Sequence, residues 1–162
     1  MGTELNELLE RYRRGPELIA AVTTGAAGAE LDFVPEPGRW SVRQIVAHLA
    51  DSEIVSAERL RRVIAEENPL LPAFDQDAWA RTLGYERRRI ADSLELFRRL
   101  RAENYRLLTG LPEEVFERSG THSERGRITL RELVASAIEH VEGHARQIQS
   151  LRAAWKERRQ QS

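Results

Sequence analysis

The sequence contains no cysteine among its 162 residues. This absence excludes disulfide bonds, zinc sites built on thiolates, and catalysis by a cysteine nucleophile. A metal ion bound by this chain would need ligands from histidine, aspartate or glutamate. The four histidines are the scarcest of these residues, so their positions carry the most information.

An excess of charge of either sign is also missing, because 25 lysines and arginines face 26 aspartates and glutamates. No basic stripe stands out, which disfavours nucleic acid and anionic membranes as partners. The N-terminal residues lack the apolar core of a signal peptide, and no segment approaches the roughly 20 apolar residues of a membrane span. We therefore expect a soluble, cytoplasmic protein that binds neither nucleic acid nor membrane.

Strand-like alternation is absent as well, and we expect no β-strand. Apolar residues instead recur three and four positions apart in four long segments. The pattern predicts long helices over about residues 3–22, 41–68, 85–109 and 129–155, with a short helical turn at 75–81. Pro16 is expected to kink or break the first helix, and Ser41 and Thr129 are expected to cap the second and the fourth.

The predicted fold is an all-α four-helix bundle, a class that often builds metal sites from side chains on facing helices. The length suits one domain, which we place at residues 1–156. Residues 157–162 are expected to form a frayed C-terminal tail.

His140 and His144 lie four positions apart on the predicted last helix, so both rings share one face, a single turn apart. They could hold one ion, or they could be an ordinary exposed or capping pair, and the spacing alone does not decide. A zincin-type protease site is disfavoured because its glutamate directly follows the first histidine. Val141 stands there, and Glu142 is about 200° round the helix from His140.

A third ligand must come from another segment, and His48 on the second predicted helix is the natural candidate. Its position is roughly 130° from the centre of that helix's apolar stripe, so the local pattern alone would place it at the surface. His122 stands in a segment flanked by glycines. It is either a hydrogen-bonding turn residue or a group on the substrate side of the site.

Further polar residues are candidates for supporting roles around such a site. Asp51, three positions after His48, could orient that ligand from behind. Gln147 shares the side of the helix that carries His140 and His144 and could contact substrate, and Arg39 could mark the rim of a pocket. Several acidic residues are as well explained by a solvated surface, so no general base is assigned; these are Glu53, Asp75 and Asp77.

Several elements of the sequence resemble the DinB superfamily. They are Gly-Arg-Trp-Ser-Val at 38–42, His-Leu-Ala-Asp-Ser-Glu at 48–53, and the pair His140-x-x-x-His144. The segments 122–126 and 129–130 resemble the YfiT-like branch of that superfamily. The resemblance extends from about Leu5 to Trp155, nearly the whole chain.

The resemblance implies a four-helix bundle, frequently a homodimer, that holds one divalent ion, zinc or nickel foremost, on His48, His140 and His144. Similar members are described as metal-dependent hydrolases, and some relatives are S-transferases that use a low-molecular-weight thiol such as bacillithiol or mycothiol. A small-molecule substrate is implied in both cases. The alternative is a non-catalytic role, either a structural metal or a stress-linked interaction module.

Overall fold

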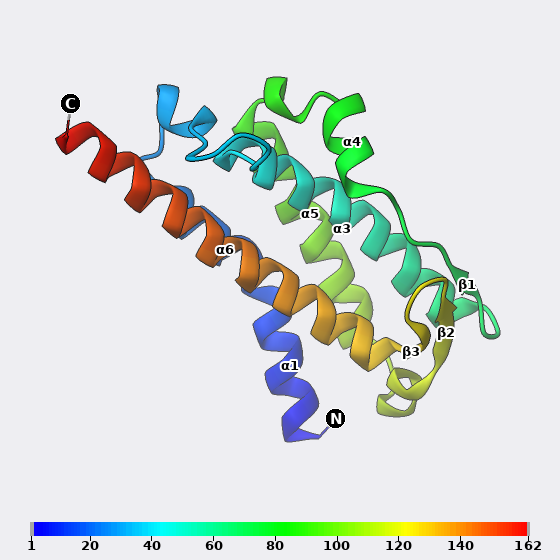
Figure 1. Ribbon diagram of the computed structural model, residues 1–162. Coiled ribbons are helices and arrows are strands. Elements are labelled where there is room, and N and C mark those ends of the chain that lie inside the picture. The colour runs from blue at the N-terminus through cyan, green and yellow to red at the C-terminus, as the bar shows by residue number, and fades with distance from the viewer. Residues whose placement is uncertain (1, 162) are drawn as a thin grey trace.

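The computed structural model describes residues 2–161 and shows a bundle of four long helical segments (Figure 1). The long helices are α1 (Thr3–Arg13) with α2 (Gly15–Thr23), α3 (Val42–Ala65), α5 (Ile90–Thr109) and α6 (Leu130–Gln160). The first segment packs between α5 and α6, and α3 packs against both of these from the other side. The predicted all-α bundle is therefore confirmed.

Short elements connect the long helices. They are α4 (Gln76–Thr82), and the 3-10 helices at Gly28–Asp32, Tyr85–Arg87 and Glu113–Glu117. None of the helices within residues 2–161 combines the length and apolarity that crossing a bilayer requires.

The first helical segment breaks where Pro16 predicts a break. α1 ends at Arg13, and α2 begins at Gly15 with the proline in its first turn, where a missing backbone N–H costs nothing. Gly15 is buried, and a Cβ atom on it would lie 3.0 Å from Nη1 of Arg101. The break thus brings α1 and α2 close to a buried guanidinium.

The two helices that carry the histidines have well-defined starts. Ser41 and Thr129 each accept a hydrogen bond from the backbone N–H three residues on, and Gln44 and Glu132 bond back to the cap residues. Both predicted caps are confirmed as capping boxes. α6 continues to Gln160, so the helix includes residues 157–160, where the sequence predicted fraying. Basic residues near its C-terminal end favour this extension by interacting with the helix dipole.

The expectation of no β-strand is wrong, since a small sheet closes one end of the bundle. Its strands, β1 (Leu70–Leu71), β2 (Ser119–His122) and β3 (Gly126–Thr129), lie in the order β1-β2-β3. β1 and β2 are parallel, and β2 and β3 form an antiparallel hairpin that leads into α6 (Figure 1). Gly120 allows the close approach of β1, because a Cβ atom there would lie 2.9 Å from the carbonyl oxygen of Pro69.

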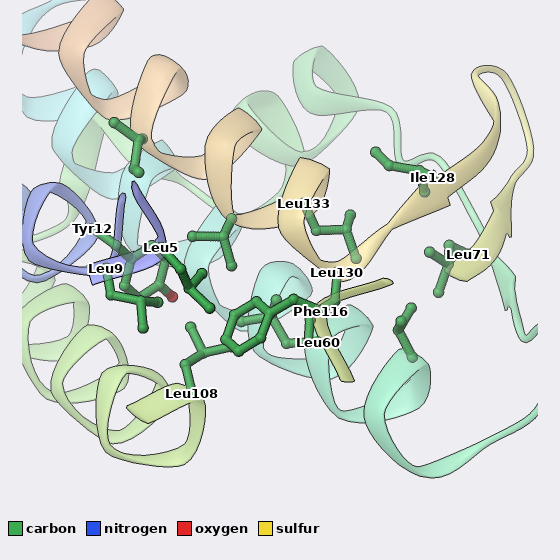
Figure 2. Close-up of a cluster of buried hydrophobic side chains, with 13 residues drawn as sticks. Leu5, Leu9, Tyr12, Leu60, Leu71, Leu108, Phe116, Ile128, Leu130 and Leu133 are labelled. Carbon is green, nitrogen blue, oxygen red and sulfur yellow. The ribbon is translucent and has the colours of Figure 1, made fainter. Parts of the chain in front are cut away.

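A cluster of buried apolar side chains anchors this sheet to the bundle. Figure 2 shows Phe116 among Leu5, Leu60 and Leu108, which come from α1, α3 and α5. Leu71 of β1 and Ile128 of β3 belong to the same cluster, so the cluster extends into the sheet. The hairpin is therefore held at a fixed position beside α3 and α6, the two helices that bear the histidines.

Candidate metal centre

Three histidine rings converge between α3 and α6. Nε2 of His140 lies 2.9 Å from Nε2 of His48 and 3.1 Å from Nε2 of His144. Metal ions hold imidazole nitrogens at about 2.0–2.1 Å, so nitrogens that share one ion must lie a few ångströms apart, as these do. Within residues 2–161 this trio is the one group of three or more histidine or acidic side chains whose ligand atoms converge in this way.

His48 is fully buried, although the local pattern of its helix would place it at the surface. The reason is tertiary, because the outer face of α3 is also covered. Ala47 packs there with Ala80 of α4 and with Tyr85, and the ring of Trp40 lies 4.7 Å from the ring of His48. α3 is therefore buried on two sides, and His48, although polar, lies on a covered side that faces α6.

The proton on His144 is placed by a neighbour on the same helix. Nδ1 of His144 lies 2.9 Å from Oε1 of Gln147, an oxygen that can only accept, so Nδ1 carries the proton. Nε2 is then left with its lone pair, the form that binds a metal ion. Gln147 thus contacts His144 directly, and its predicted contact with substrate stays a prediction.

Burial keeps the three rings neutral. It lowers the pKa of His48 to about 3 and that of His140 to about 4, with the neighbouring histidines adding to both effects. Burial also lowers the pKa of His144, against the opposing hydrogen bond to Gln147. Neutral imidazole is the ligand form, so no proton has to leave at neutral pH before an ion can bind.

A cavity of about 360 Å³ opens beside the trio, between α3, α6 and the hairpin. His140 and Ser52 form its inner wall, and Oγ of Ser52 lies 3.3 Å from Nε2 of His48. His122 lines the same cavity. The structure therefore brings four histidines to one region, three in contact and the fourth in the wall of the same cavity.

Two other predicted site residues lie elsewhere. Asp51 accepts two hydrogen bonds from the guanidinium of Arg88, at 2.6 and 3.0 Å, instead of orienting His48. Three positions along a helix correspond to a rotation of roughly 60°, which turns Asp51 towards the segment after α4. Arg39 is exposed in the loop before α3 and is not part of the cavity wall.

The sequence did not point to a buried ion pair that also lines the cavity. Glu53 and Arg101 are 3% and 2% exposed, and Arg101 donates to both carboxylate oxygens, at 3.0 and 2.7 Å. Tyr12 and Asn104 donate to the same carboxylate, each at 2.9 Å. A signal was available, since Arg101 falls four residues after the buried Phe97, on the inward face of α5.

In metal-free protein, acidification from pH 7 to pH 5 is expected to lower the free energy of unfolding. The pKa values of His48 and His140 in the folded state lie below the ordinary 6.5, so the unfolded chain binds more protons in this interval. This stability is complete above about pH 6.5 and is lost as the pH falls towards 4. Urea denaturation with EDTA at a series of pH values measures the effect.

The interval from pH 7 to pH 5 separates the effect of the histidines on stability from that of the acidic groups. Carboxylates with a lowered pKa, such as Glu10 and Glu95, begin to lose their contribution only below about pH 4.5. Burial also lowers the pKa of His122, so His122→Gln serves as the control. The pH dependence should persist in that variant. A stability that stays constant or rises from pH 7 to pH 5 contradicts the neutral, buried trio.

Comparison with known proteins shows which family the chain resembles. The model of the DinB superfamily matches residues 11–148. A protein of Oceanobacillus iheyensis is 31% identical over 91% of this chain and 85% of its own length, and one of Geobacillus thermodenitrificans is 28% identical over 92% and 84%. Both carry the name "putative metal-dependent hydrolase".

A solved structure agrees over nearly the whole chain. YfiT from Bacillus subtilis superposes with a TM-score of 0.89 at 25% sequence identity, over 96% of this chain and 90% of that one. It is described as "a probable metal-dependent hydrolase with an unusual four-helix bundle topology". The family model, the relatives and the fold agree over most of the chain, and the chain belongs to the DinB superfamily.

Proposed function

We propose that this protein binds one divalent metal ion on His48, His140 and His144 and uses it to hydrolyse a small molecule. The observation that carries the proposal is the meeting of three Nε2 atoms at the wall of a cavity. The names of the relatives support it. Zinc and nickel are the ions we propose first, because both suit imidazole ligands.

The residues around the trio prepare it for this role. Gln147 holds His144 in the tautomer that leaves Nε2 free, and Trp40 shields the ring of His48. An ion bound by three neutral imidazoles keeps its full charge and lowers the pKa of a water or thiol that reaches it. The cavity beside His140 admits the substrate, and its size lies in the range of small-molecule sites.

Transfer of a low-molecular-weight thiol is the second candidate reaction. Among the described residues no carboxylate forms a hydrogen bond with the three rings, and Glu142 instead pairs with Arg11 of α1 at 2.9 Å. A thiol ionises far more readily than water, so it depends less on a general base. The homodimer implied by the resemblance stays a prediction.

Metal analysis followed by activity screening tests the proposal. Protein purified without added metal should contain about one divalent ion per chain, since neutral, converging imidazoles bind strongly. Esters, amides and electrophiles, each with and without a thiol, should turn over only in the metal-loaded protein. Turnover that requires the thiol would identify the transferase. A bound ion without turnover would indicate a structural metal. Absence of a bound ion would refute the proposal.

A further inference from the structure

The cavity beside the metal centre is also lined by donors that the proposed chemistry does not use. His122 ends β2, Arg125 lies in the turn of the hairpin, and Arg59 projects from α3. All three line the same cavity as His140. The hairpin is anchored by the buried apolar cluster, so the backbone that carries His122 and Arg125 is fixed beside α3, from which Arg59 projects.

His122 presents an N–H group to the cavity. Its Nδ1 accepts hydrogen bonds from the backbone N–H groups of Glu124 and Arg125, at 3.2 and 3.3 Å. The proton of the neutral ring must then lie on Nε2. Within residues 2–161 this Nε2 has no hydrogen-bond partner, and it is not one of the fully buried polar atoms that lack a partner. It is therefore accessible to a ligand.

The two arginines also keep unused donors. The guanidinium of Arg59 donates one bond, from Nη2 to the carbonyl oxygen of Pro72 at 2.5 Å, and the guanidinium of Arg125 donates only to the hydroxyl of Ser136, at 3.2 Å. Neither forms an ion pair within residues 2–161. Each guanidinium has five N–H donors in a planar fork, which suits carboxylate and phosphate oxygens.

The charge around the cavity favours an anion. Burial lowers the pKa of Arg59, and the positive charge of Arg125 adds to this effect, against the opposing negative charges of Glu58 and Glu124. Two glutamates also line the cavity, Glu124 and Glu53. The charge of Glu53 is already neutralised by its ion pair with Arg101. Three arginines against two glutamates leave one net positive charge on the wall, before any metal ion is counted.

We infer that the substrate carries an anionic oxygen group, a carboxylate or a phosphate, which binds Arg59, Arg125 and Nε2 of His122 while the rest of the molecule extends towards His140. This inference rests on the proposed function and specifies its substrate class. The cavity volume of about 360 Å³ limits the substrate to a small molecule. Two guanidiniums and one N–H group can share the oxygens of a single anionic group.

Calorimetric titration with inorganic phosphate and with succinate tests the site. Metal-free protein is titrated first, because an anion there cannot bind to an ion on the histidines, and zinc-loaded protein second. At least one of the two anions should bind saturably at low ionic strength, and the stronger one identifies the preferred group. Arg59→Gln and Arg125→Gln should each weaken that binding at least tenfold, since each removes a charge-assisted contact.

Arg127→Gln is the matched control, because Arg127 is an exposed arginine of the same hairpin that does not line the cavity. It should change the affinity by less than twofold. The inference is wrong if neither anion binds, or if the control weakens binding as much as the cavity variants. Metal content measured on the same samples keeps the two claims apart: uptake of zinc without anion binding refutes only the anion site, whereas absence of zinc refutes the proposed function.

Discussion

Replacing His140 with alanine is expected to abolish stoichiometric metal binding and, with it, all metal-dependent turnover. His140 is the central member of the trio, since its Nε2 lies 2.9 and 3.1 Å from the other two. Its loss leaves two imidazoles on different helices. Changing a residue that only supports a ligand typically costs 10- to 100-fold in metal affinity, so loss of a ligand should cost about a thousandfold or more.

Two measurements check this result. After dialysis against metal-free buffer, the variant should retain less than about a tenth of the original metal, in line with the expected loss of affinity. Added zinc should raise the melting temperature of the unchanged protein, because a ligand at about 1,000 times its Kd stabilises the folded state by about 4 kcal/mol. The variant should show almost none of this stabilisation.

His122→Ala is the matched control for this experiment. It removes the same kind of side chain from the same cavity, but one that is not part of the trio. It should keep its metal and its zinc-dependent stabilisation. If His140→Ala binds zinc as tightly as the unchanged protein does, the ion lies elsewhere and the trio is not the metal centre.

The sequence predicted the two histidines of α6 better than the one of α3, for a physical reason. His140 and His144 belong to one helix, so their spacing alone brings the rings together. His48 reaches them through the packing of α3 against α6, and its burial depends on Trp40 and on the segment around Tyr85. Helical periodicity does not report burial by other segments, so the resemblance to the DinB superfamily was needed to join His48 to the other two histidines.

The sheet and the buried ion pair were missed for different reasons. β1 has two residues and β2 and β3 have four each, too short for alternation to show, and β1 lies far from the hairpin in the sequence. Glu53 looked like a solvated acid because its partner, Arg101, is 48 residues away. Long-range pairing decides both features, and local patterns do not report it.

Replacing Arg101 with methionine is expected to destabilise the fold by about 3–5 kcal/mol, the usual cost of removing one partner of a buried pair. The carboxylate of Glu53 would stay buried without its charged partner, and the backbone carbonyl of Tyr12 would lose the bond it accepts at 3.1 Å. The pair is nearly inaccessible to water, so solvent cannot replace the guanidinium. Urea denaturation at pH 7 measures the loss.

The cause of that loss can be tested with two further variants. Arg98→Met, three residues earlier on α5, breaks an exposed pair with Glu95 and should cost far less, because water can replace the lost partner. The double variant Arg101→Met with Glu53→Met removes both charges, and it should be less destabilised than the sum of the single changes, because no unpaired charge remains buried. If Arg101→Met costs no more than Arg98→Met, the buried pair does not stabilise the bundle. Strictly additive costs would instead show that the two residues act through packing and not as a charge pair.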